Sequence, residues 1–140
     1  MVVNGDTNGF ARYDAGTDAF EAPQAARSDT APPAIDATGN TVVAGGDVYD
    51  GSLHYARTFR VAARQADPSA LSPDGATDYM AIAGGIVRSR VSDGSIMDRI
   101  RAGNVPIAVV RISPDGTTLA TVTNYGDQAG ICIVDLTQLH

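Results

Sequence analysis

Two stretches of the chain end in the same turn phrase: Ala-Leu-Ser-Pro-Asp-Gly at residues 70–75 and Arg-Ile-Ser-Pro-Asp-Gly at residues 111–116. The second phrase follows the first by 41 positions, and short apolar runs come after both, at residues 79–83 and 119–123. Proline presets φ for the second position of a turn, aspartate caps the turn through its side chain, and glycine accepts positive φ. The phrase therefore predicts a tight corner between two antiparallel strands, repeated along the chain.

A third, degenerate copy of the corner lies upstream, at residues 33–40. It lacks the Ser-Pro pair but keeps Asp36 and Gly39, and it leads into another apolar run, residues 41–45. Residues 1–5 resemble that run, so we expect the chain to begin inside a repeat. A strand-and-turn repeat of about 40 to 50 residues is typical of a β-propeller blade.

The second half of each repeat also recurs, as an alternating strand followed by an aspartate turn, at residues 9–16, 85–94 and 130–136. Counting strands in this way gives roughly three, four, four and three. We therefore predict an all-β fold of β-propeller blades, each a four-stranded antiparallel sheet, with about three and a half blades in an incomplete ring. The expected organisation is one partial propeller domain over residues 1–140, with approximate repeats 1–30, 31–67, 68–104 and 105–140.

These motifs resemble the YVTN and WD40-like family of bacterial β-propellers, whose repeats carry a Ser-Pro-Asp-Gly corner, a strand and then a Val-Ile-Asp-Leu type strand. The matching segments are residues 112–123 with 131–136, and residues 71–83 with 86–94. The resemblance implies a propeller fold and an extracytoplasmic location, although no export signal is visible at the start of this chain. Such propellers usually close a ring of seven or so blades, which 140 residues cannot build alone.

Composition agrees with an all-β protein. Fifteen of the sixteen acidic residues are aspartate and all ten basic residues are arginine, so the charged side chains are turn formers more often than helix formers. Hydrophobic residues make up 44% of the chain, enough for a core. The net charge of −6 disfavours nucleic-acid binding, which depends on clustered cations, and we expect no membrane span.

Arginine and cysteine side chains supply a few candidate functional groups. The densest basic stretch contains Arg57, Arg60 and Arg64, and Arg88 and Arg90 share one strand face by their spacing. These arginines either hold an anionic ligand or, as we prefer, form solvated surface. Cys132 lies in an apolar strand, where we expect it to be buried as a small packing residue.

The segment at residues 4–9, Asn-Gly-Asp-Thr-Asn-Gly, imitates the start of a calcium-binding EF-hand loop. That loop needs a bidentate acid at its twelfth position, where this chain has Ala15. We prefer a glycine-rich corner between two strands, with weak calcium binding by loop oxygens left open.

The chain contains no nucleophile elbow, no phosphate-binding Gly-Lys-Ser/Thr loop and no zinc-binding His-Glu-x-x-His motif. If propeller loops gather catalytic groups, the candidates are Asp47, Asp50, His54, Tyr125 and Asp127, but nothing in their spacing shows that they converge. We therefore assign no catalytic, cofactor-binding or metal-binding residue.

Two functions from different classes follow. The preferred one is a non-catalytic scaffold module that binds a protein or a small ligand at a loop face, as a fragment or assembling part of a larger propeller. The alternative, implied by the resemblance, is a propeller enzyme, either a lactonase-like hydrolase or a quinone-dependent dehydrogenase. Because an open arc leaves two end sheets uncovered, we expect either a homodimer that completes a ring of about seven blades or a chain that is unstable alone.

Overall fold

The computed structural model describes residues 2–5, 9–22, 24–25, 32–61, 68–102, 106–125 and 128–139. The described residues form four antiparallel sheets that follow one another along the chain. Sheet 1 contains β1 (Val2–Gly5), β2 (Gly9–Asp14), β3 (Ala19–Phe20) and β4 (Gln24–Ala25); sheet 2 contains β5 (Ala34–Ile35), β6 (Thr41–Ala44), β7 (Asp47–Asp50) and β8 (Tyr55–Thr58). Sheet 3 contains β9 (Ser69–Leu71), β10 (Thr77–Ile82), β11 (Gly85–Arg90) and β12 (Ile96–Arg101); sheet 4 contains β13 (Ile107–Ile112), β14 (Thr118–Tyr125) and β15 (Gln128–Asp135).

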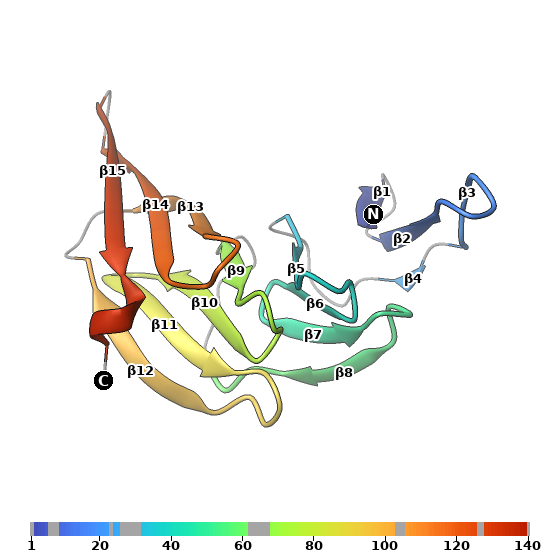
Figure 1. Ribbon diagram of the computed structural model, residues 1–140, viewed down its shortest axis with the longest axis horizontal. Helices are drawn as coiled ribbons and strands as arrows, with labels where there is room; N and C mark the ends of the chain where they lie inside the picture. The colour runs from blue at the N-terminus through green and yellow to red at the C-terminus, as the bar shows by residue number, and fades with distance from the viewer. Residues whose placement is uncertain are drawn as a thin grey trace.

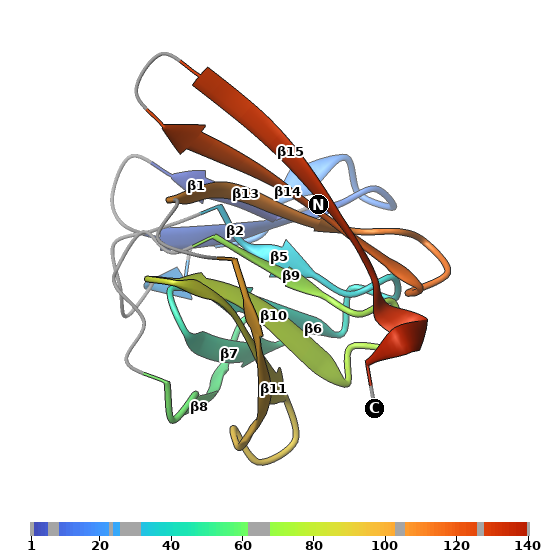
Figure 2. The same ribbon diagram turned by 90° about the vertical axis from the view of Figure 1, so that its left-hand side faces the viewer.

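The sheets are arranged as an arc of propeller blades, as Figure 1 shows, with sheet 1 at one tip and sheet 4 at the other. The first strands of the last three sheets, β5, β9 and β13, lie beside one another on the inner side of the arc, and β8 and β12 lie on the outer side. Figure 2 shows the same sheets in a side view, turned by 90° from that of Figure 1. The predicted all-β, incomplete propeller is confirmed, and the only helical segment in the described ranges is the short 3₁₀ turn η1 (Leu136–Gln138).

The two Ser-Pro-Asp-Gly corners have equivalent structures, which confirms the repeat. The Ser72 hydroxyl donates to Asp74 Oδ1 at 2.5 Å and accepts from the Thr77 amide at 2.9 Å. In the second corner, Ser113 makes the same two bonds, at 2.5 Å to Asp115 and 2.9 Å from the Thr118 amide. Both corner glycines have positive φ, +70° and +74°. Each corner thus satisfies its own polar groups and starts the next strand in register.

The degenerate corner keeps this shape with different side chains. Asp36 takes over the capping role, accepting from the amides of Thr38 at 3.1 Å and Asn40 at 3.0 Å. Gly39 again has positive φ, +73°. All three corners of this chain share an aspartate and a glycine, which are therefore the residues that the turn requires.

Apolar side chains fill the three seams between neighbouring sheets. In each seam, one face of a sheet packs on the opposite face of the sheet that follows it in the sequence. The seam of sheets 1 and 2 contains Phe10, Val42, Ala44, Tyr49 and Leu53. The next seam contains Ala34, Val43, Val48, Phe59, Leu71, Met80 and Val91, and the last contains Ala70, Tyr79, Ala81, Ile86, Val110, Leu119 and Leu136. Burying a large apolar side chain contributes about 1.5 to 3 kcal/mol, so these seams hold the arc together.

The end sheets are incomplete in the way the strand count predicted. In sheet 1, β3 and β4 both pair with β2, at its opposite ends, so they share one strand position. In sheet 4, β15 pairs with β14 and has no further neighbour among the described strands. Sheets 2 and 3, by contrast, each have four consecutive strands.

The predicted burial of Cys132 is wrong. Cys132 does lie in β15, but its side chain is exposed, as are its neighbours Ile131 and Ile133. The apolar run was interpreted as a buried strand, whereas the structure places it at the uncovered end of the arc. Ile131 and Ile133 project from the face of sheet 4 that no described sheet covers. Cys132 projects from the other face, with its cross-strand partner Thr121, but it lies on the edge strand β15 and outside the apolar cluster that fills the seam with sheet 3.

In the described part of the chain, no helix is long and apolar enough to cross a membrane. The calcium-like segment can be followed at its flanks, where β1 and β2 pair through Gly5 and Gly9. Residues 6–8 lie outside the described ranges, so the loop itself is not described. Its flanks are strands, as predicted, and not the helices of an EF-hand.

Candidate functional site

The loop residues named as catalytic candidates have separate structural roles. Asp50 accepts from the amides of Ser52 at 2.9 Å and His54 at 3.0 Å, and its carboxylate lies 3.5 Å from His54 Nδ1. These bonds, first the one from the His54 amide, lower the pKa of Asp50. Asp47, on the same strand, accepts from the Thr58 hydroxyl at 2.5 Å. Asp50 and His54 meet on the surface as a turn cap, and Asp47 belongs to the β7–β8 pairing.

The structure describes less of the two remaining loop candidates, Tyr125 and Asp127. Asp127 lies outside the described residues, and only the backbone of Tyr125 is described, at the end of β14. Within the described ranges, no group of three or more His, Cys, Asp or Glu side chains is placed to hold a metal ion.

The arginines singled out from the sequence have different surroundings. Arg88 forms a 2.7 Å ion pair with Asp98 across β11 and β12, and Arg90 lies 3.4 Å from Asp93. A β-bulge falls between Arg88 and Ser89, so the strand is not regular at this point. Arg57 is half-buried on β8 and Arg60 is exposed, whereas Arg64 lies outside the described residues. Arg57, Arg60, Arg88 and Arg90 do not line the cleft described next.

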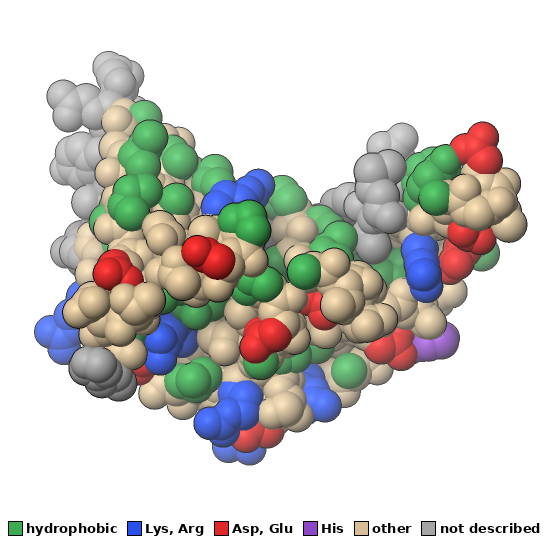
Figure 3. Space-filling view, in the orientation of Figure 1, with side chains coloured by type: hydrophobic (Ala, Val, Ile, Leu, Met, Phe, Trp, Pro, Cys, Tyr) green, Lys and Arg blue, Asp and Glu red, His purple; other side chains and the backbone are tan. Residues whose placement is uncertain are grey.

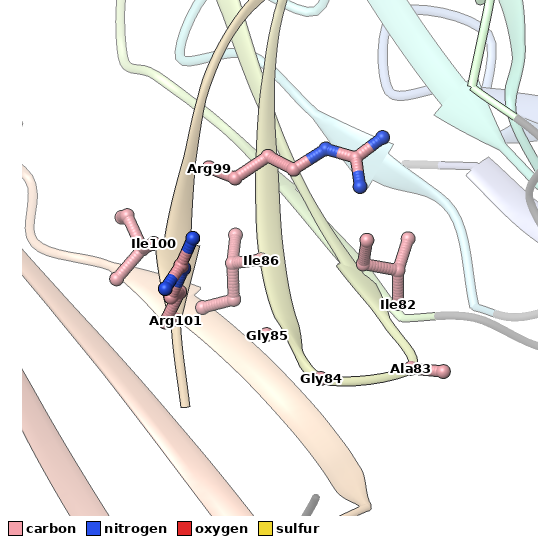
Figure 4. A pocket seen from close by; sticks show the side chains of 8 residues that line it. All are labelled: Ile82, Ala83, Gly84, Gly85, Ile86, Arg99, Ile100 and Arg101. Carbon is pink, nitrogen blue, oxygen red and sulfur yellow. The ribbon is translucent and has the colours of Figure 1, made fainter. Parts of the chain in front are cut away.

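A cleft of about 470 Å³ lies at the end of sheet 3, around the hairpin that joins β10 to β11. Figure 4 shows the side chains at this cleft, with Arg99 extending toward the side of Ile82 and Arg101 at the end of β12 beside Ile100. Its full lining is Ile82, Ala83, Gly84, Gly85, Ile86, Arg99, Ile100 and Arg101. The cleft therefore combines an apolar wall, a bare glycine turn and two cationic side chains.

Close approach of the backbones sets the shape of this cleft. A Cβ on Gly85 would lie 2.1 Å from the Ile100 carbonyl oxygen, and Gly85 has a φ of +155°. The Ala102 amide donates to the Gly84 carbonyl at 3.1 Å, which fastens the end of β12 to the hairpin. Arg101 is opposite Gly85 and Arg99 is opposite Val87, so both arginines project from the same face of β12.

The charge of the cleft is opposite to that of the whole chain. Among the described residues, no acidic side chain lines the cleft, and none forms an ion pair with Arg99 or Arg101. Guanidinium groups bind carboxylates and phosphates through paired N–H donors. On a chain with a net charge of −6, this is a local site suited to an anion.

Sequence reasoning missed Arg99 and Arg101. Their signal was the Arg-Ile-Arg spacing in the strand after the Asp93-Gly94 turn, which puts both arginines on one face. The same spacing at Arg88 and Arg90 looked equivalent. Only the packed sheet shows that Asp98 pairs with Arg88 and Asp93 with Arg90. Neither aspartate pairs with Arg99 or Arg101.

A second unpredicted feature is the carboxyl group of Asp78, which is fully buried between sheets 2 and 3. Burial raises its pKa to about 8, and the nearby Ser69 hydroxyl only partly opposes the shift. Neither carboxyl oxygen has a hydrogen-bond partner, and the buried Ser89 hydroxyl, opposite Asp78 on β11, also has none. The 41-residue period places Asp78 where the next repeat has the buried Leu119. Asp78 is therefore a polar residue at a core position.

Comparison with solved structures defines the class of protein as a β-propeller. The chain is similar to the β-propeller domain of Cps50 (Swd1) from Myceliophteria thermophila, with a TM-score of 0.63 and 18% identity over 79% of this chain and 37% of that one. It is also similar to hydrazine synthase from Kuenenia stuttgartiensis, with a TM-score of 0.76 and 20% identity over 93% of this chain and 40% of that one.

These likenesses concern the fold alone, because both identities are low. The chain spans about two fifths of the length of each of the two solved chains. No family model matches the chain, and no curated protein sequence matches it either. The sequence resemblance to YVTN and WD40-like propellers is thus supported at the level of the propeller fold.

Proposed function

We propose that the chain is a non-catalytic β-propeller scaffold module and an assembling part of a larger propeller. Its repeats, at approximately residues 1–30, 31–67, 68–104 and 105–140, would each contribute one blade of a single domain. Three apolar seams make the arc a rigid support for the loops and strand ends at its surface. A rigid support is what a binding site needs to hold its side chains in fixed positions.

The site that we propose for ligand binding is the cleft at the end of sheet 3. The observation that carries this proposal is the pair of arginines, Arg99 and Arg101, which line a cleft without acidic side chains. A cation that is not neutralised within the protein can be neutralised by a ligand. Ile82 lies opposite Gly85 and therefore on the same face as Arg101, and this apolar side chain suits a ligand that also carries a hydrocarbon part.

The proposal is tested by titrating the chain with citrate, inorganic phosphate and a neutral sugar in a calorimeter. Citrate and phosphate should bind, citrate more tightly, and the sugar should not. A charge-assisted hydrogen bond contributes about 1.5 to 3 kcal/mol, so Arg99→Gln and Arg101→Gln should each weaken citrate binding about tenfold or more.

The matched control is the pair Arg57→Gln and Arg60→Gln, which removes two positive charges from the β8 edge and leaves the cleft unchanged. Equal losses of affinity in the control and cleft variants would mean that the anions respond only to overall charge. That result, or an absence of anion binding to the unaltered chain, would refute this site.

A further inference from the structure

The two tips of the arc expose apolar sheet faces. In sheet 4, Ile131 is 77% exposed and Ile133 is 62% exposed. Both project from the face opposite to the one that packs on sheet 3, together with Val109, Ala120 and Val122. We call this set the outgoing face of sheet 4. Figure 3 shows hydrophobic side chains at the surface over this arm of the molecule.

The equivalent face of sheet 3 is buried. By the 41-residue period, Ala120 corresponds to Tyr79 and Val122 to Ala81. Tyr79 and Ala81 are buried, because sheet 4 packs on them with Val110 and Leu119. The outgoing face of sheet 4 thus has the pattern of a face that another sheet covers, and no sheet of the described residues covers it.

The other tip presents the complementary kind of face. In sheet 1, Phe10 packs on sheet 2, where its ring meets the Tyr49 ring at 5.4 Å. Tyr13 lies three residues further along β2 and therefore on the opposite side, with its ring 5.3 Å from that of Phe20. Phe20 is 53% exposed. We call this aromatic side the incoming face of sheet 1.

Every seam inside the chain joins an outgoing face to an incoming face, and this happens three times. The described residues leave one outgoing face and one incoming face uncovered, and Figure 1 places them at opposite tips of the arc. Within the described residues they do not meet. Between two chains they can, by the same packing that the chain already uses at its own seams.

We propose that two copies of this chain close a ring, with the outgoing face of sheet 4 in each copy packed on the incoming face of sheet 1 in the other. The proposal deepens the scaffold function and rests on it, since it names the partner that completes the propeller. Four sheets from each copy make a ring of eight, within the usual range of about four to eight blades. The proposed ring thus has one blade more than the sequence expectation of about seven.

The test measures the mass of the full chain in solution by sedimentation equilibrium. The unaltered chain should have twice the 14.4 kDa monomer mass. Ile131→Asp and Phe20→Asp each place a charge in one of the two faces, and each should weaken dimerisation at least tenfold. The matched control is Ile96→Asp, which alters a side chain that is 40% exposed on β12, away from both tips. Its dimerisation should be unchanged.

Mixing the two face variants distinguishes this arrangement from other dimers. An equimolar mixture of Ile131→Asp and Phe20→Asp retains one unaltered interface, so it should form a mixed dimer that neither variant forms alone. A monomeric unaltered chain, an open-ended polymer, a dimer that only one of the two face variants disrupts, or a mixture without recovery would overturn the proposal. Circular dichroism on each variant checks that its strands have formed.

Failure of the ring and failure of the scaffold function give different results. Citrate binding at Arg99 and Arg101 uses residues of sheet 3 alone. A monomer that still binds citrate would refute the ring and leave the binding function standing. A dimer that binds no anion would support the ring and refute the proposed ligand site.

Discussion

The buried carboxyl group of Asp78 makes the stability of the protein depend on pH in an unusual direction. An aspartate has an ordinary pKa of 3.8, and burial between sheets 2 and 3 raises that of Asp78 to about 8. The folded chain therefore holds this proton over a range in which the unfolded chain releases it. The stabilisation is complete below pH 3.8 and is lost progressively as the pH rises to about 8.

The size of the effect follows from the shift in pKa. One pKa unit corresponds to about 1.4 kcal/mol, so Asp78 lowers the free energy of unfolding by about 4 kcal/mol at pH 7, compared with acid conditions. Above pH 8 the loss levels off at about 6 kcal/mol. Small domains are stable by only about 5 to 15 kcal/mol, so this is a large fraction of the total.

The perturbation is Asp78→Leu, which copies the residue that the next repeat carries at Leu119. This variant should be more stable than the unaltered chain by several kcal/mol at pH 7, and the difference should shrink toward acid pH. Asp78→Asn keeps the shape and a polar group, and should also remove the loss between pH 4 and pH 8. Urea unfolding followed by circular dichroism at several pH values measures both effects.

The matched control is Asp74→Asn in the neighbouring corner. Hydrogen bonds, first from the Ser72 hydroxyl and then from the Ala76 amide, lower the pKa of Asp74, so this carboxylate stabilises the fold above its ordinary pKa and loses that effect in acid. Its replacement should leave the slope between pH 5 and pH 8 unchanged. If Asp78→Asn and the unaltered chain show the same slope there, the account of Asp78 is wrong.

Three further predictions test the corners, the close approach and the open end. Gly85→Ala should destabilise the fold by several kcal/mol, because its Cβ would lie 2.1 Å from a carbonyl oxygen. Gly39→Ala, whose Cβ would have no atom within 4 Å, should lower the free energy of unfolding by only about 1 to 2 kcal/mol because of its positive φ. Urea unfolding compares the two variants. Ser113→Ala should raise the lowered pKa of Asp115 toward its ordinary value, which carboxyl NMR measures; an unchanged pKa would contradict the corner geometry. Cys132 should react with Ellman's reagent in the folded chain nearly as fast as in urea, and protection until unfolding would show that it is buried.

The corners were predictable because their chemistry is local. Pro73 and Gly75 define a turn through their own dihedral preferences, and Asp74 caps it with its own side chain. The repeat of that turn after 41 residues carried the fold class, since like corners imply like strand pairs. None of this required knowledge of which sheet packs on which.

The missed features are those that depend on packing between sheets. Asp78 looks like an ordinary turn-flanking acid in the sequence, and only the stacking of sheet 3 on sheet 2 buries it. Cys132 looks like a core residue, and only the packing of sheet 4 shows that the apolar cluster of the seam with sheet 3 does not extend to it. Arg99 and Arg101 look like Arg88 and Arg90 until the ion pairs are known.

The central claim is that sheets 3 and 4 are equivalent blades, and cross-strand contacts measured by NMR test it most directly. Ala81 faces Ile86 in sheet 3, and Val122, 41 residues after Ala81, faces Ile131 in sheet 4. Both are expected to be pairs without mutual backbone hydrogen bonds, in which the two Cα atoms lie about 4.5 Å apart. We predict strong nuclear Overhauser effects between the α-protons of each pair. Their absence from either pair, or a series of helical contacts between residues three apart, would contradict the account.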